Sequence, residues 1–272
     1  MQPDLHCSYR PAPPLDRFVE RLWYWEGTPP SHAKDRLMPT GGASLVINLA
    51  EDEIRSYSGP DDSIVAVHPG AVIVGACSRY TVIDTREQRA VLGVTFLPGG
   101  MMPFFDPAAD ELSNTHSGLC DVWGTHGSTL RERVLAAATP HSRLKVVEAE
   151  LLRRALRPLQ RRADIDFVIA QLTHRPDRSI ASVSKRAGLS GRRITRLFAI
   201  ETGLTPKLYA RVKRFERALQ FFSTDADWSD LAARCGYFDQ SHLIRDCREI
   251  SGYTPEQLQA RRTGGTNHVA VG

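Results

Sequence analysis

A segment of this chain, residues 180–255, occurs twice in nearly the same form, and this repeat constrains the fold more than any other feature. Gly188 and Gly236 occupy the same place in the two copies and lie 48 residues apart. Each copy reads as a short amphipathic stretch, a glycine turn and a second amphipathic stretch, closed by a Thr-Pro pair. Because that order is typical of a helix-turn-helix, the sequence predicts two such subdomains in an all-α C-terminal domain.

The first copy shows how the two faces of its second helix would differ. Gly188 can take the positive φ needed to leave a helix sharply, and Ser190 can cap the next helix. Apolar residues spaced i, i+3 and i+4 predict a buried stripe, made of Ile194, Leu197 and Phe198. The residues left on the open face are Arg192, Thr195 and Arg196.

The second copy repeats this division. Gly236 forms the turn, Asp239 is the cap, and Leu243 faces inward. The residues expected to face outward are Gln240, Ser241, His242 and Arg245. Arg and Gln have side chains that match guanine and adenine edges in the major groove, so both open faces predict DNA contact. The equivalent positions of Arg196 and Arg245 favour a shared role, while base contact, phosphate contact and simple solvent exposure stay open for the others.

The motifs of the second copy resemble those of a known family. The run Gly-x-x-Asp-Gln-Ser-His-Leu-x-Arg at 236–245 and the Gly-Tyr-Thr-Pro at 252–255 are similar to the signature of the AraC/XylS bacterial transcription regulators. The resemblance covers residues 163–262 and implies a long helix, here Pro206 to Phe222, between the two subdomains. The chain departs from the family pattern at two neighbouring positions, Cys247, where the family usually has Phe, and the acidic Asp246 beside the expected DNA face.

Whole-chain properties exclude several other classes of protein. At 272 residues the chain suits two domains of ordinary size. Its five cysteines show no C-x-x-C pattern, so we expect reduced thiols, no metal site and no cofactor. With no signal peptide and no apolar run of membrane-spanning length, we expect a cytoplasmic protein that does not enter a membrane.

Charge is divided unevenly along the chain. Residues 163–272 hold 17 Lys and Arg against 12 Asp and Glu, whereas residues 1–162 hold 18 against 19. The positive excess therefore lies with the repeat, as expected for a domain that meets phosphates. The excess is small, and charge alone would not establish DNA binding.

The N-terminal half predicts many short strands separated by turn signals. The strand candidates are residues 23–25, 43–49, 64–67, 71–75, 80–84 and 90–96. Such a pattern favours a barrel or sandwich over a parallel sheet, so we expect an α+β chain with a β-barrel-like N-terminal domain. Alternation would place Trp23 and Trp25 on one face of a strand, where they could line an effector pocket or fill the core.

Residues 1–125 also resemble the sensor domain of one subgroup of the same family, through motifs such as Trp23-Tyr24-Trp25 and the Pro-Gly-Gly at 98–100. This implies a regulatory domain that responds to a small-molecule effector. Two amphipathic helices within 126–162 predict a linker or dimerisation segment, followed by the DNA-binding domain at 163–262. Residues 263–272 predict a disordered tail.

The resulting functional hypothesis is a sequence-specific transcription regulator that binds double-stranded DNA at a bipartite site, with half-elements about one turn apart. The family resemblance leaves room for contact with RNA polymerase and for a homodimer. The alternative is a small-molecule-binding module whose DNA-binding half is non-specific or architectural. An enzyme is not expected, because the sequence has no nucleophile elbow, Gly-rich phosphate loop or acid/base pair at helical spacing.

Overall fold

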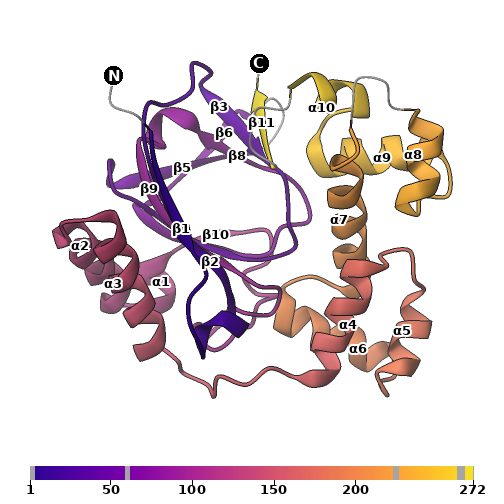
Figure 1. The fold of residues 1–272 in the computed structure, drawn as a ribbon, viewed down its shortest axis with the longest axis horizontal. Helices are drawn as coiled ribbons and strands as arrows, with labels where there is room; N and C mark the ends of the chain where they lie inside the picture. Colours follow the sequence, from indigo (N-terminus) through magenta and orange to yellow (C-terminus); the bar gives the residue numbers. More distant parts are fainter. Residues whose placement is uncertain (1–3, 59–61, 223–226, 262–266, 272) are drawn as a thin grey trace.

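A computed structural model describes residues 4–58, 62–222, 227–261 and 267–271 (Figure 1). Its N-terminal part is built from strands and its C-terminal part from helices, which confirms the predicted α+β class. Within the described residues, none of the helices is long and apolar enough to cross a membrane.

The strands form two antiparallel sheets rather than a closed barrel, so the barrel-like expectation was too specific. The six-stranded sheet, sheet A, has the order β1 (Leu5–Tyr9), β2 (Val19–Glu26), β9 (Ala90–Phe96), β4 (Ser44–Asn48), β7 (Ala71–Val74) and β10 (His116–Gly118). The five-stranded sheet, sheet B, has the order β11 (His268–Val271), β3 (Lys34–Leu37), β8 (Thr81–Asp84), β5 (Glu53–Ser58) and β6 (Ile64–Pro69).

Strand β2 shows how side-chain alternation builds sheet A. Tyr24 is completely buried in the core, whereas Trp23 and Trp25 are half-buried on the opposite face. Trp23 lies opposite Gly93 of β9, and a Cβ atom at Gly93 would come within 2.2 Å of the indole ring. The glycine therefore makes room for the indole across the sheet.

Three helices cover sheet A: α1 (Leu119–Trp123), α2 (Thr125–Ala136) and α3 (Pro140–Arg153). The two helices predicted within 126–162 are found as α2 and α3. Their buried residues share one apolar core with sheet A and include Leu130, Val134, Leu144, Val147 and Leu151. The apolar faces of α2 and α3 are therefore covered by sheet A. The domain limits at residues 125 and 162 remain predictions.

The C-terminal tail differs from the sequence prediction. Residues 263–272 were expected to be disordered, but His268–Val271 form β11, which pairs antiparallel with β3. Val269 is 2% exposed and shares a core with Met38, so burial of an apolar side chain at a sheet edge orders this segment. Residues 262–266 and 272 lie outside the described residues.

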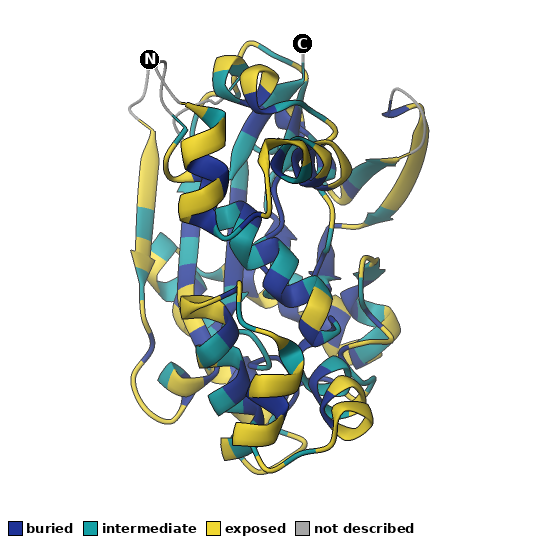
Figure 2. Ribbon diagram, turned by 90° about the vertical axis from the view of Figure 1, so that its right-hand side faces the viewer, coloured by how far each residue is buried: buried dark blue, intermediate teal, exposed yellow. Residues whose placement is uncertain are grey.

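The helical half consists of α4 (Ala163–His174), α5 (Ile180–Arg186), α6 (Gly191–Thr202), α7 (Pro206–Leu219), α8 (Trp228–Cys235), α9 (Gln240–Ser251) and α10 (Pro255–Arg261). Figure 2 shows their inward faces buried and their outward faces exposed. The connecting helix α7 buries Val212, Phe215 and Leu219, and it ends at Leu219 rather than at the predicted Phe222. The repeat thus folds as two helix-turn-helix units, α5–α6 and α8–α9, on either side of α7.

Candidate nucleic-acid interface

The first recognition helix, α6, begins where the sequence predicted. Gly188 has a φ of +69°, and the Ser190 side chain accepts a hydrogen bond from the backbone N–H of Arg193 at 3.3 Å. Ile194 and Phe198 are completely buried, which fixes the rotation of the helix about its axis.

The opposite face of α6 carries the three residues predicted to bind DNA. Arg192, Thr195 and Arg196 are all exposed. The Thr195 hydroxyl donates a 2.9 Å hydrogen bond to the carbonyl of Gly191, so it is engaged within the helix. Among the described residues, neither arginine has a carboxylate within ion-pair distance, and both positive charges remain available to a phosphate or a base edge.

The second recognition helix, α9, is capped in the same manner. Gly236 has a φ of +80°, and the Asp239 side chain accepts a 2.7 Å hydrogen bond from the backbone N–H of His242. The predicted residues Gln240, Ser241 and Arg245 are exposed. His242 is half-buried, because its ring packs edge-on against Tyr237 with centroids 5.2 Å apart. Of the four predicted residues, His242 is therefore the least open to DNA.

Asp246, the acidic residue that seemed misplaced beside the DNA face, points into the protein. It is 3% exposed, and its Oδ1 accepts a 2.7 Å hydrogen bond from Arg211 Nε of α7. Its Oδ2 lies 3.6 Å from Nη2 of Arg214, also on α7. Both arginines thus hold α9 against the connecting helix. Cys247 is likewise completely buried in the core of this subdomain.

The N-terminal half contacts the C-terminal ends of both recognition helices. The backbone N–H of Ala109 donates to the carbonyl of Ile200 in α6 at 3.0 Å, and that of Tyr80 donates to the carbonyl of Ile250 in α9 at 2.7 Å. Gly252, the glycine that ends α9, also packs closely against Arg36, because a Cβ atom at Gly252 would come within 2.4 Å of Arg36 Nη1. Both helices are thus held at one end and exposed at the other.

Further contacts between Arg36 and the second subdomain reinforce this arrangement. The Arg36 guanidinium lies between the rings of Tyr80 and Tyr253, 4.2 Å from each centroid. Its Nη1 donates to the carbonyl of Ser251 at 3.2 Å. No local sequence pattern connects these residues, because Arg36 and Tyr80 lie 44 positions apart and Tyr253 lies a further 173 positions along the chain.

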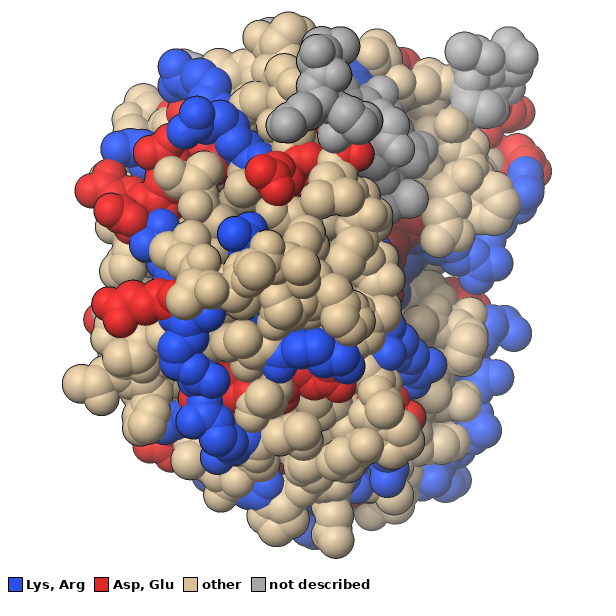
Figure 3. Space-filling model, turned by 60° about the vertical axis from the view of Figure 1, so that its left-hand side comes forward, with Lys and Arg blue, Asp and Glu red and all other residues tan. Residues whose placement is uncertain are grey.

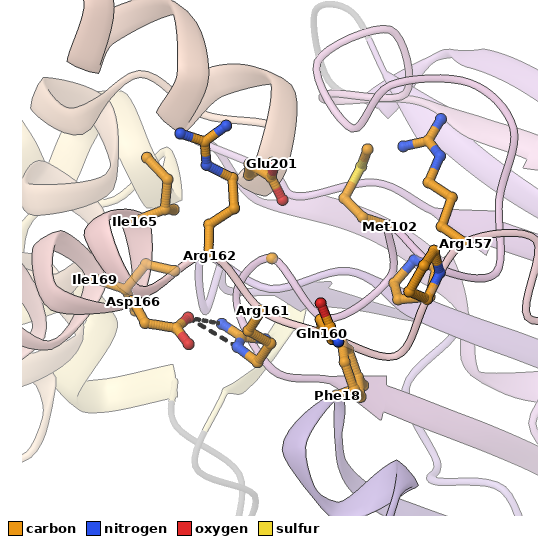
Figure 4. A pocket seen from close by; sticks show the side chains of 13 residues that line it. Phe18, Met102, Arg157, Gln160, Arg161, Arg162, Ile165, Asp166, Ile169 and Glu201 are labelled. Atoms are coloured by element: carbon orange, nitrogen blue, oxygen red, sulfur yellow. Dashed lines mark hydrogen bonds and ion pairs between the residues drawn. The ribbon is translucent and has the colours of Figure 1, made fainter.

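A cavity of about 110 Å³ lies where the two halves of the chain meet (Figure 4). Phe18 and Met102 come from the N-terminal half, and Ile165, Ile169 and Glu201 from α4 and α6. The segment that joins the halves contributes three arginines, Arg157, Arg161 and Arg162. Arg161 is paired with Asp166 at 2.6 Å, and burial raises the pKa of the Glu201 carboxyl.

The predicted effector residues Trp23 and Trp25 do not line this cavity. They do not line a second groove of about 750 Å³ either, which is bordered by residues 176–180, by α7 and by Arg245 of α9. Their proposed role in effector binding stays a prediction. On the face that Figure 3 brings forward, positive and negative side chains are interspersed. That face therefore lacks the one-sided positive charge expected of a DNA-binding surface.

Two family models match parts of the chain. Residues 183–261 match a family model described as a helix-turn-helix domain, and residues 7–118 match one described as a domain of unknown function, DUF6597. No curated protein matches the chain.

Solved structures of ToxT from Vibrio cholerae are similar over most of the chain. The fatty acid-bound form has 9% sequence identity and a TM-score of 0.47, over 96% of this chain and 96% of that chain. A complex of ToxT with (E)-4-(8-methylnaphthalen-1-yl)but-3-enoic acid has 8% identity and a TM-score of 0.47, over 88% of this chain and 97% of that chain.

The helix-turn-helix match spans both the second recognition helix and the signature residues at 236–245 and 252–255. The paired units and their connecting helix have the arrangement that the resemblance implied. Residues 183–261 are therefore a helix-turn-helix domain of the AraC type, and residues 7–118 form an N-terminal DUF6597 domain.

Proposed function

We propose that this protein is a sequence-specific regulator that reads a bipartite DNA site with two recognition helices. One observation carries the proposal: Arg196 and Arg245 occupy equivalent exposed positions on α6 and α9, without a carboxylate partner among the described residues. An arginine kept unpaired on the open face of a recognition helix is suited to guanine or phosphate.

The length of α7 supports a spacing of one DNA turn between the half-elements. Its 14 residues span about 21 Å at a rise of ~1.5 Å per residue. Adding the widths of the flanking helices, about 10 Å in total, brings the separation of α6 and α9 near the ~34 Å of one turn. We therefore propose half-elements about 10 bp apart on one face of the duplex. The exposed N-terminal ends of both helices would enter the major groove.

Selection of bound sequences from a random DNA library, at one stated salt concentration, tests this function. The expected product is two short elements at a constant spacing of about 10 bp. Recovery of sequences without a common element would favour the alternative, in which the DNA-binding half is non-specific or architectural.

We further propose that a small anionic effector binds in the cavity between the two halves. Arg157 can pair with a carboxylate, while Met102, Ile165 and Ile169 offer apolar contact. Arg162 is already paired with Asp164 at 2.7 Å. Because Glu201 belongs to α6, a ligand in this cavity would touch the first recognition helix directly.

A bound effector should raise the midpoint of thermal unfolding, because ligand at about 100 times its dissociation constant stabilises a protein by about 2.7 kcal/mol. The measurement is a thermal-shift screen with small aliphatic and aromatic carboxylates, run on the wild-type chain and on Arg157→Gln. We expect a shift that the substitution reduces. A shift that is equal in both proteins would place the ligand elsewhere, and no shift with any carboxylate would remove this ligand class.

A further inference from the structure

Phe238 is the most exposed large apolar side chain among the described residues. It is 93% exposed, compared with 58% for Ile64, the next highest value. A phenylalanine that is nearly fully exposed leaves most of its apolar surface in water, and burying it against a partner is favourable.

The residues on either side of Phe238 hold its backbone in place. Tyr237 is 4% exposed, and its backbone N–H donates to the carbonyl of Ala232 at 2.9 Å. Asp239 caps α9 through the backbone N–H of His242. With the preceding side chain buried in the core and the following one committed to the cap, the ring of Phe238 is kept on the outside.

Phe238 also lies next to the proposed DNA-contacting residues of α9, two positions before the helix begins at Gln240. Ser241 and Arg245 of α9 are both exposed. Phe238 directly precedes the N-cap Asp239, so its ring lies at the exposed N-terminal end of the helix. The N-terminal end of a recognition helix is the part that meets base edges in the major groove.

We infer that Phe238 contacts the C5-methyl group of a thymine in the second half-element. This inference rests on the proposed function. A phenyl ring offers neither charge nor a hydrogen bond, and the thymine methyl is the apolar group that the major groove presents. Phe238 would then specify an A·T pair at one position, beside the contacts made by Arg245.

Replacement of single thymines by uracil tests the contact, because uracil lacks only the methyl group. On the selected site, each thymine of the second half-element is changed in turn. The wild-type chain should lose about fourfold in affinity at one position, as expected for about 0.8 kcal/mol per buried methyl-sized group. Phe238→Ala should bind the thymine site about tenfold or more weakly and should be insensitive to uracil at that position.

Phe221→Ala is the matched control, since Phe221 is also exposed, at 38%, but lies just beyond the end of α7 rather than at the N-terminal end of α9. It should keep the wild-type affinity and the wild-type response to uracil.

Three results would overturn the inference. If Phe238→Ala binds the site as tightly as the wild-type chain, a partner other than DNA covers the ring. If the variant binds weakly but keeps the response to uracil, the ring touches the sugar-phosphate backbone. If the wild-type chain prefers no sequence, both the proposed function and this inference fail.

Discussion

Insertion of about five base pairs between the two half-elements should reduce binding to the level of random DNA, a loss of about a thousandfold or more. Half a turn of added helix moves one element to the opposite face of the duplex. The two recognition helices cannot follow this rotation, because α7 joins them and the N-terminal half is hydrogen-bonded to Ile200 of α6 and to Ile250 of α9.

An insertion of about ten base pairs separates a rigid pair of readers from a flexibly joined pair. It returns both elements to one face but moves them a further ~34 Å apart. A rigid pair should still fail, whereas flexibly joined readers would recover much of their affinity. Recovery with ten base pairs would show that the contacts with the N-terminal half do not set the spacing, and full binding after the five-base-pair insertion would contradict a bipartite site.

Substitution Asp246→Ala should lower the free energy of unfolding by about 2–4 kcal/mol. It removes the carboxylate that pairs with Arg211 and Arg214, and the side chains of these arginines are only 24% and 17% exposed. The expected loss of stability is smaller than the loss for a fully buried ion pair, because water reaches both arginines. Urea unfolding of the wild-type chain and the variant measures the difference, provided that the free energy of unfolding falls with urea concentration at the same slope in both proteins.

Glu249→Ala provides the matched control for this substitution. Glu249 pairs with the same arginine, Arg211, but its own side chain is 47% exposed. An exposed pair contributes about 0–1 kcal/mol, so this variant should remain close to the wild type. Equal effects of the two substitutions would show that Asp246 does not anchor α9. If the anchor is real, Asp246→Ala should also weaken discrimination at the second half-element more than Glu249→Ala does.

The repeat made the helical half predictable because its signals are local. Gly188 and Gly236 take the positive φ that their positions in the turns require, and Ser190 and Asp239 cap the helices that follow. Burial and exposure along α6 and α9 follow the 3.6-residue period, so the outward residues could be named in advance. Asp246 escaped the same reasoning because its orientation depends on Arg211, a residue 35 positions earlier on another helix.

The N-terminal half was less predictable because its sheets depend on distant pairings. The motif Trp23-Tyr24-Trp25 indicated a strand, but only pairing with β9 shows that Tyr24 enters the core while the tryptophans face the other way. Strand β11 was missed altogether: Val269 is an ordinary residue in sequence, and its burial follows from the open edge that β3 presents.

The central claim is that each recognition helix reads its own half-element, and Arg196→Ala and Arg245→Ala test it most directly. The affinity of each variant is measured for four DNAs: the intact site, the site with either half-element scrambled, and the site with both scrambled. If the arginines read bases, each variant should lose about 1–3 kcal/mol of discrimination at one half-element and keep the other. Arg196→Ala should lose discrimination at one half-element, and Arg245→Ala should lose it at the other. If each variant loses the same affinity on all four DNAs, and its affinity depends less steeply on salt, the arginines contact phosphates. Unchanged affinity in both variants would contradict the two-reader mechanism.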